Sequence, residues 1–409
     1  MSVELSTPKN FVDLADPKSF QDAVPHAEFE RLRNEAPVHW TPTQFGTATG
    51  GFWSLTRYAD VAAATRDTQT FSSSLGICYP VNYDEPPLMV DNVNYADPPR
   101  HGELRAHISS AFAARVVAGF EGWITEQVRI ILDGLDGRGE CDLVPLVAVE
   151  LPARVICSVM GVPEDKRTQV VTWIEKSFAR LRPDGGQEVA RAATEAMLNF
   201  AVELRDANED ILADDTMLGE LARAERNGTK FTDSEFMQMF MTLLVGGFES
   251  TATLIAQSLR LLLEDPEIAA QARNAYEHNQ IRELVDEFLR YITPVQHMAR
   301  HATKDIELHG QTIRKGDMVL LWYASANRDS EIFENPHHFD AFRKPNRHQA
   351  FGAIGGPHFC IGANLARLEV QILLREMFSR DIKITRNGTP NRGVSVFVNQ
   401  LDSLPVVCE

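Results

Sequence analysis

The fold is decided by the segment Phe351-Gly352-Ala353-Ile354-Gly355-Gly356-Pro357-His358-Phe359-Cys360-Ile361-Gly362, a glycine-rich loop that runs directly into a predicted helix. From Ala363 to about Arg380, apolar residues recur with helical spacing at Ala366, Val370, Leu373, Leu374 and Met377. Cys360 is therefore expected at a helix N-terminus, where backbone N–H groups lower a thiol pKa and stabilise the thiolate that binds metals. The usual alternative for a lone cysteine is a buried, inert thiol, but such a thiol does not require four surrounding glycines and a helix start.

Length, composition and charge restrict the class of the protein. Its 409 residues, 44% hydrophobic and 24% charged, have an ordinary globular composition, and length alone favours two or three domains. No linker rich in Pro, Gly or Ser divides the chain, so we expect a single domain over residues 1–409. The formal net charge of −17, from 40 Lys and Arg against 57 Asp and Glu, disfavours nucleic acid and anionic membrane surfaces as partners.

The cysteines and the N-terminal segment indicate the cellular compartment in which the protein is expected to work. Five cysteines, an odd number without close spacing, form neither a disulfide framework nor a CxxC metal motif. The first residues, MSVELSTPKN, lack a basic stretch followed by an apolar run, and no stretch of about 18 uncharged apolar residues occurs. We expect a cytoplasmic protein with reduced thiols, outside any membrane.

Helical patterns dominate the chain, but three parts, at about 35–57, 295–325 and 383–409, are predicted to be β-rich. In the first part, two short strands flank a turn rich in Thr and Gly, and a helix begins at Tyr58. In the second part, strands lie on either side of a turn at 315–317. These two parts are far apart in sequence, so their pairing in one small sheet is a hypothesis.

The clearest helix is predicted over Asp233–Glu264. Thr232 and Glu235 fit a capping box, and Pro266 follows the helix end. At ~1.5 Å per residue, such a helix is about 48 Å long and can cross a domain. Residues 245–251 place two glycines, an acid and two hydroxyls inside its apolar run. A close helix crossing would explain the glycines but not the acid, so a functional role is favoured.

Residues 76–99 are rich in Pro, Asn and Asp, have no periodicity and are predicted to form a long loop. The loop carries more apolar side chains than a solvent-exposed loop needs. Two interpretations stay open: a loop packed on the core, or a lid over a binding site.

The Cys360 segment resembles the haem-binding signature of the cytochrome P450 superfamily, F-x-x-G-x-[HR]-x-C-x-G, as found in bacterial members. Gly356 and Gly362 occupy the glycine positions and His358 the His/Arg position. The resemblance implies that Cys360 is the thiolate ligand of the haem iron. Phe351 lies nine residues before Cys360 instead of seven, so the loop has two extra residues and the side chain that shields the sulfur stays open.

An ExxR motif and a central acid–hydroxyl motif follow the order expected for this family. Glu287 and Arg290 share one helix face, and with Arg343 they resemble the family's Glu-Arg-Arg structural triad. Residues 246–251 resemble the oxygen-activating motif [AG]-G-x-[DE]-T-[TS], which implies that Glu249, Ser250 and Thr251 are catalytic. Ser250 replaces the usual threonine: it keeps the hydroxyl but loses the methyl group that restricts its rotamer.

A third motif, at residues 97–105, resembles the family's D-P-P-x-H-x-x-x-R segment. By this resemblance His101 and Arg105 bind the haem propionates, together with Arg300 and His358. Buried carboxylates need cationic partners, which agrees with these residue types.

The resemblance implies a mainly α fold, a large helical domain with a small β-rich lobe, built around haem b (heme b, iron protoporphyrin IX). The implied activity is that of a haem-thiolate monooxygenase, which uses O2 to hydroxylate or O-demethylate a small hydrophobic substrate. No flavin or iron–sulfur motif is present, so we expect electrons from a ferredoxin-type donor with its NAD(P)H-dependent reductase. The donor would dock on the Cys360 side, with Arg115 as a basic contact, and the protein is expected to be a monomer.

A hydrophobic substrate is expected, such as a terpenoid, steroid, branched lipid or aromatic ether, because the candidate pocket residues are nearly all apolar. These residues are Ile77, Leu88, Met89, Val93, Thr242, Val245, Gly246, Val295 and Phe397. An aromatic carboxylate would need a pocket arginine, for which Arg180 and Arg182 are candidates.

Two alternative functions stay open. A peroxide-driven haem peroxygenase of the same fold usually lacks the acid–hydroxyl pair that Glu249 and Ser250 provide. A haem sensor or binding protein without turnover would be expected to lose that pair as well. Retention of Glu249 and Ser250 therefore favours the monooxygenase.

Overall fold

Two distant parts of the chain form the main sheet of the computed structural model, which describes residues 11–81, 91–181, 186–207, 216–226, 229–380 and 382–409. Its five strands have the order β1-β2-β10-β7-β3, and β2 runs parallel to β10 with Phe52 beside Met318. The hypothesis that the first two β-rich parts share a sheet is confirmed. Residues 306–313 do not join it, because β8 and β9 pair only with each other. The strands of the main sheet and this hairpin are β1 (Val38–Pro42), β2 (Gly51–Leu55), β3 (Phe71–Ser72), β7 (His297–Ala302), β8 (Ile306–Leu308), β9 (Gln311–Ile313) and β10 (Met318–Trp322).

The third β-rich part forms a smaller sheet with a strand that the sequence pattern did not indicate. β14 pairs antiparallel with β11 on one side and with β4 on the other. β4 was missed because it is short and lies between helical segments. The remaining strands are β4 (Gly139–Asp142), β5 (Glu225–Arg226), β6 (Thr229–Lys230), β11 (Ile384–Arg386), β12 (Asn391–Arg392), β13 (Leu401–Ser403) and β14 (Pro405–Cys408).

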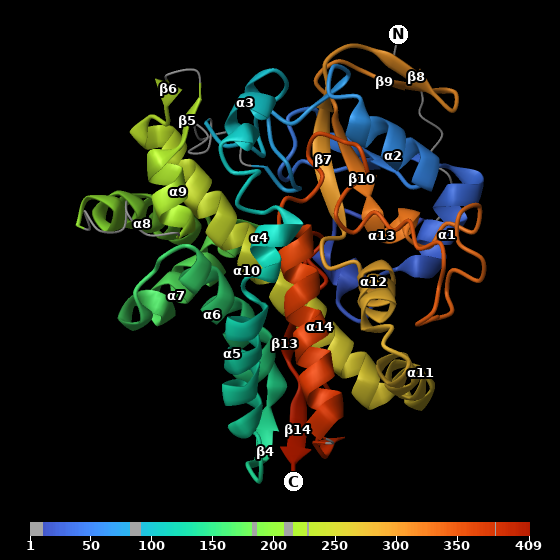
Figure 1. Ribbon diagram of the computed structural model, residues 1–409. Coiled ribbons are helices and arrows are strands. Elements are labelled where there is room, and N and C mark those ends of the chain that lie inside the picture. Colours follow the sequence, from blue (N-terminus) through green and yellow to red (C-terminus); the bar gives the residue numbers. More distant parts are fainter. Residues whose placement is uncertain (1–10, 82–90, 182–185, 208–215, 227–228, 381) are drawn as a thin grey trace.

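Helices make up the rest of the architecture, as Figure 1 shows: α5 to α10 gather on one side, and α1, α2 and α13 lie around the main sheet. They are α1 (His26–Glu35), α2 (Tyr58–Arg66), α3 (Arg100–Ala106), α4 (Ala114–Ala118), α5 (Glu121–Asp133), α6 (Glu150–Val159), α7 (Arg167–Ser177), α8 (Gln187–Asp206), α9 (Met217–Arg223), α10 (Asp233–Glu264), α11 (Pro266–Glu277), α12 (Ile281–Ile292), α13 (Tyr323–Ala326) and α14 (Ala363–Arg380). Short helical turns are η1 (Pro17–Phe20), η2 (Val144–Val149), η3 (Glu164–Lys166) and η4 (Phe178–Leu181).

The long helix α10 crosses the molecule and has the predicted bounds (Figure 1). The capping box is present: the Glu235 backbone N–H donates to the Thr232 hydroxyl at 3.2 Å, and the Thr232 N–H donates to the Glu235 carboxylate at 2.7 Å. Among the described residues, α10 alone is long and apolar enough to cross a membrane, and 67% of its apolar window is buried inside the protein. Packing within the protein therefore accounts for its apolar surface.

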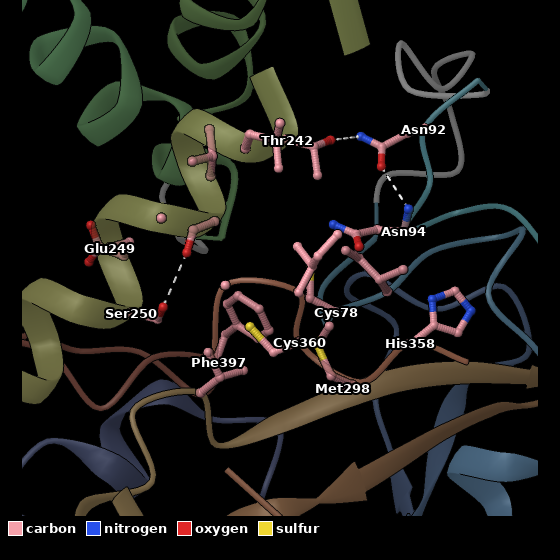
Figure 2. A pocket seen from close by; sticks show the side chains of 18 of the residues that line it. Cys78, Asn92, Asn94, Thr242, Glu249, Ser250, Met298, His358, Cys360 and Phe397 are labelled. Atoms are coloured by element: carbon pink, nitrogen blue, oxygen red, sulfur yellow. Dashed lines mark hydrogen bonds between the residues drawn. The ribbon is translucent and has the colours of Figure 1, made fainter. Parts of the chain in front are cut away.

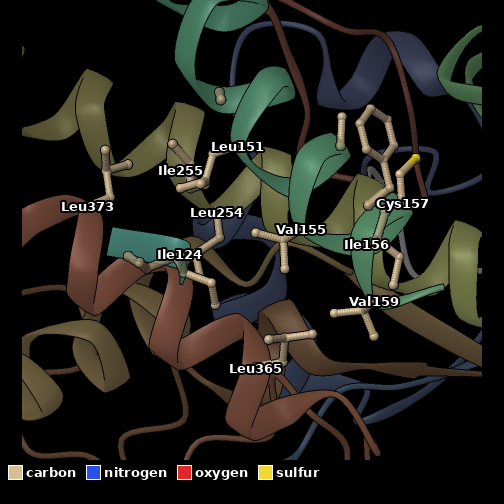
Figure 3. Packing of buried hydrophobic residues seen from close by; sticks show 14 of the residues in the cluster. Ile124, Leu151, Val155, Ile156, Cys157, Val159, Leu254, Ile255, Leu365 and Leu373 are labelled. Carbon is tan, nitrogen blue, oxygen red and sulfur yellow. The ribbon is translucent and has the colours of Figure 1, made fainter. Parts of the chain in front are cut away.

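The largest core cluster lies where α5, α6, α10 and α14 meet. Ile124, Ile156, Leu254 and Leu365 from these four helices converge in Figure 3, and each is at most 5% exposed. Full burial of such a side chain contributes about 1.5–3 kcal/mol. A Cβ on Gly247 would lie 2.6 Å from Ile156 Cδ1, so this glycine permits the close approach of α10 to α6.

A buried ion-pair network ties α12 to the chain that leads into the Cys360 loop. The carboxylate of Glu287 accepts from Arg290 Nη2 at 2.7 Å and Nε at 2.8 Å, and from Arg343 Nε at 3.2 Å. Arg290 also donates to the carbonyls of Asn327, Pro336 and His338. Because every charge has a partner, the network satisfies the condition under which buried ions are tolerated.

We predict that Glu287→Ala lowers the free energy of unfolding by about 3–5 kcal/mol, because it leaves two buried guanidinium groups without their carboxylate. Chemical denaturation followed by far-UV circular dichroism measures the change. Glu121→Ala is the matched control, since the Glu121–Arg375 pair, 3.1 Å apart, is about half exposed and is expected to contribute about 1 kcal/mol or less. Equal losses in the two variants would contradict a structural role for the network.

Candidate active site around Cys360

Cys360 lies at the end of a tight loop, just before α14. Its backbone N–H donates to the carbonyl of Phe351 at 2.9 Å, so the two residues lie close together although nine positions separate them. The extra residues bulge outward: Ile354 is 63% exposed, and Gly352 and Gly355 have φ angles of +82° and +84° that favour glycine. Phe351 lines the same cavity as Cys360. Phe351 therefore lies next to Cys360 through the backbone despite the longer loop.

The expected depression of the Cys360 thiol pKa is wrong for the protein without a bound metal. The Cys360 side chain is exposed to the cavity, but the protein that surrounds the sulfur raises this pKa by desolvation. The N–H groups of Gly362 and Ala363 and the nearby Arg105 and Arg367 lower it only in part. The helix N-terminus thus acts in the predicted direction but is outweighed by loss of hydration. A coordinated metal ion would supply the charge that deprotonates the thiol.

A cavity of about 550 Å³ opens above Cys360 and brings together most of the predicted pocket (Figure 2). Its walls include Ile77, Val93, Thr242, Val245, Gly246, Val295 and Phe397. Leu88, Met89 and Arg182 lie outside the described residues, and so does the side chain of Arg180. The part of the 76–99 loop that is described has neither helix nor strand and borders this cavity.

Three basic side chains from distant segments also line this cavity: Arg105 from α3, Arg300 from β7, and His358 from the Cys360 loop. His101, also from α3, lies directly behind them, against His358. The two imidazole centroids are 4.2 Å apart. Burial, together with the guanidinium groups of Arg105 and Arg300, lowers the pKa of His101 to about 4 and that of His358 to about 2. The nearby carboxylate, Asp97, is already bonded to the Ser73 N–H at 3.0 Å and to the Ser72 hydroxyl.

This basic cluster fits the carboxylates of a haem. Within the described part of the chain, His101 Nε2 and Arg300 Nε are buried without a hydrogen-bond partner. Buried donors and charges without partners are costly, so the cluster favours an anionic ligand group. A haem carries two carboxylates beside an apolar ring, which matches a cationic cluster and a thiol in one cavity.

The acid–hydroxyl motif faces the same cavity from the middle of α10. Burial and the neighbouring acids Glu175 and Asp402 raise the pKa of Glu249 to about 7. Its carboxyl points away from Cys360 in Figure 2, while the Ser250 hydroxyl donates to the Gly246 carbonyl at 3.2 Å. A Cβ on Gly246 would meet nothing within 4 Å, so this glycine leaves open space above Cys360, unlike the packed Gly247.

The cavity also contains an acid that the sequence reasoning missed. Glu369 on α14 is 2% exposed, burial raises its pKa well above the usual value, and among the described residues its Oε2 has no partner. The sequence contained a signal for this residue: Glu369 follows Ala366 by three residues and precedes Leu373 by four, so an acid adjoins the apolar stripe of the helix.

Comparisons with known proteins agree with this geometry. Residues 165–381 match the family model described as Cytochrome P450. The chain is 31% identical to the steroid C26-monooxygenase of Rhodococcus jostii, over 98% of this chain and 85% of the relative. It is 32% identical to the methyl-branched lipid omega-hydroxylase of Mycobacterium tuberculosis, over 95% and 92% of the two chains.

A solved structure supports the fold as well as the family. Mycobacterium marinum cytochrome P450 CYP268A2, in complex with pseudoionone, superposes with a TM-score of 0.88 at 30% identity over 99% of this chain and 100% of that one. The predicted mainly α architecture with a small β-rich part is confirmed. The chain therefore belongs to the cytochrome P450 family and is a P450 monooxygenase.

Proposed function

We propose that this enzyme hydroxylates or O-demethylates a small hydrophobic molecule, with O2 and electrons from a ferredoxin and its NAD(P)H-dependent reductase. One observation carries the proposal: Cys360 and the Glu249–Ser250 pair open onto the same largely apolar cavity. A peroxide-driven enzyme or a binding protein would not need that pair.

Haem b fits the residues that surround this cavity. Cys360 would hold the iron, and Arg105, Arg300 and His358 of the cavity wall, with His101 beside His358, would hold the two carboxylates. When bound, the haem supplies the reaction with O2 that inserts one oxygen atom into the substrate. Phe351, beside Cys360, would shield the sulfur from solvent.

Within this assignment, Glu249 and Ser250 handle protons. A carboxyl with a pKa of about 7 is well matched to give and regain protons at neutral pH. The carboxyl points away from Cys360, whereas Ser250 lies one residue along α10 and lines the cavity. We assign Glu249 to take up protons and the Ser250 hydroxyl to pass them into the cavity; Thr251, 3% exposed, would support this segment.

The substrate class follows from the walls of the cavity and agrees with the relatives. Val93, Val245, Val295 and Phe397 offer apolar surface without charge. The named relatives act on a steroid and on methyl-branched lipids, and the solved relative binds pseudoionone. A terpenoid, steroid, branched lipid or aromatic compound of similar hydrophobicity is the substrate class we assign.

Electron delivery is assigned to the face on the Cys360 side. Arg115 is exposed on α4, and α4 packs against α14, the helix that follows Cys360. An exposed arginine there would contact an acidic ferredoxin.

We predict that Cys360→Ser abolishes the absorption band typical of a thiolate-ligated haem when the reduced, haem-loaded protein binds carbon monoxide. Cys78→Ser is the matched control, because Cys78 is a second cysteine in the wall of the same cavity. The control is expected to keep the band. A band that survives Cys360→Ser and disappears in Cys78→Ser would assign the ligand to the other cysteine.

Removal of the proton-handling groups is expected to uncouple oxygen consumption from product formation. Glu249→Gln and Ser250→Ala should each slow product formation by on the order of 100-fold, because a positioned proton donor is lost, and divert electrons to peroxide. Product, oxygen consumption and peroxide are measured together in the reconstituted system. Unchanged coupling in both variants would remove these residues from the mechanism.

The pH profile gives a separate test of Glu249. Since protonated Glu249 is the donor, product formation should fall as pH rises through about 7. The Glu175 charge contributes to the raised pKa, so Glu175→Gln should move the fall to lower pH. The rate of product formation is measured from pH 5.5 to 9 for the wild-type protein and for Glu175→Gln, and the two pH profiles are compared. Identical profiles would show that a group other than Glu249 titrates.

A further inference from the structure

A polar seam runs along the otherwise apolar α10 and holds the loop residues 91–94. Ser234, Gln238 and Thr242 recur every four residues and so share one face of the helix. The Ser234 hydroxyl donates to Asp91 Oδ2 at 2.7 Å, and the Asp91 N–H donates to Gln238 Oε1 at 2.8 Å. Thr242, the last member, is bonded to the side chain of Asn92. The seam fixes this part of the loop against α10 at the edge of the cavity.

The bonds of Asn92 determine where the Thr242 hydroxyl hydrogen points. Asn92, 2% exposed, accepts from the Asn94 N–H at 2.8 Å through Oδ1, which orients its amide. Its Nδ2 then faces Thr242 and must donate, so Thr242 Oγ1 is the acceptor (Figure 2). Among the described residues no group accepts the Thr242 hydroxyl hydrogen, and Thr242 lines the cavity. This hydrogen is therefore available to a ligand.

Asn94 supplies a second polar group at the same place. Its backbone is held by Asn92, its side chain lines the cavity, and among the described residues the side-chain amide has no hydrogen bond. An amide can donate through nitrogen and accept through oxygen. Together with Thr242 it can receive a carbonyl oxygen, through two donors, or a hydroxyl group, through one donor and one acceptor.

The charges nearby disfavour an anionic group at this position. The arginines in the described wall of the cavity are Arg105, Arg191 and Arg300. Arg191 pairs with Glu195 at 3.0 Å. Arg105 and Arg300 belong to the basic cluster that would bind the haem carboxylates. The charged residue next to Asn92 is the acid Asp91. A carboxylate bound by Thr242 and Asn94 would lose hydration without gaining a cation.

We propose that Thr242 and Asn94 form a polar anchor for a neutral oxygen, a ketone or an alcohol, at one end of an otherwise apolar substrate. The proposal rests on the function proposed above and narrows its substrate class. Along α10, Thr242 precedes Gly246 by one turn, about 6 Å, and Ser250 by two turns. The anchored oxygen therefore lies several carbon atoms from the bond that is oxidised.

A matched set of ligands tests the anchor: 4-phenylcyclohexanone, phenylcyclohexane and 4-phenylcyclohexanecarboxylate, titrated by calorimetry into the haem-loaded protein. The ketone is expected to bind more tightly than the hydrocarbon and the carboxylate. Thr242→Val and Asn94→Leu should each reduce the ratio of ketone to hydrocarbon affinity by about three- to tenfold, as expected for loss of one hydrogen bond. Thr242→Ser, which keeps the hydroxyl, should restore most of the ratio.

Thr194→Val is the control, because Thr194 also lines the cavity but its hydroxyl already donates to the Ala190 carbonyl at 2.8 Å. It should leave the ketone-to-hydrocarbon ratio unchanged. Ketone binding no tighter than that of the hydrocarbon, an unchanged ratio in both anchor variants, or tightest binding of the carboxylate would overturn the proposal. The carbon monoxide band, recorded on the same preparations, reports separately on the proposed haem-thiolate function.

Discussion

The arrangement around Cys360 depends on the ion pairs that the Glu287 carboxylate forms with Arg290 and Arg343. The carboxylate is fully buried, and it is held by two arginines, one from its own helix and one from the segment that leads into the Cys360 loop. A buried charge tolerates little displacement, because movement of either partner leaves an ion without compensation. The network therefore fixes the direction from which the loop approaches α14.

The helix α10 combines packing and chemistry within a few turns, because residues on different faces meet different surroundings. Gly247 permits contact with Ile156, whereas Gly246 leaves space over Cys360. One turn earlier Thr242 belongs to the polar seam, and three residues after Gly246 the carboxyl of Glu249 lies among other acids. A helix that were only a core element would need none of these polar groups.

The electrostatics of the cavity are unevenly distributed. Cationic and imidazole groups gather at one side of Cys360, and the two acids in the described wall, Glu249 and Glu369, both have raised pKa values. Loss of hydration is the first cause of both shifts, and it favours the neutral form of an acid. The cavity is therefore positive where it would meet the haem carboxylates and close to neutral where it would meet an apolar substrate.

Features set by local patterns could be predicted from the sequence, and features set by burial could not. The bounds of α10 followed from its capping box and proline, and the Cys360 loop and α14 followed from glycines and helical periodicity, because these signals act between residues close in the chain. The direction of the Cys360 pKa and the pairing of Asn92 with Thr242 depend on which distant groups meet and on how the surrounding protein changes hydration. Only the tertiary structure decides those contacts, since hydration and pairing are properties of the packed chain.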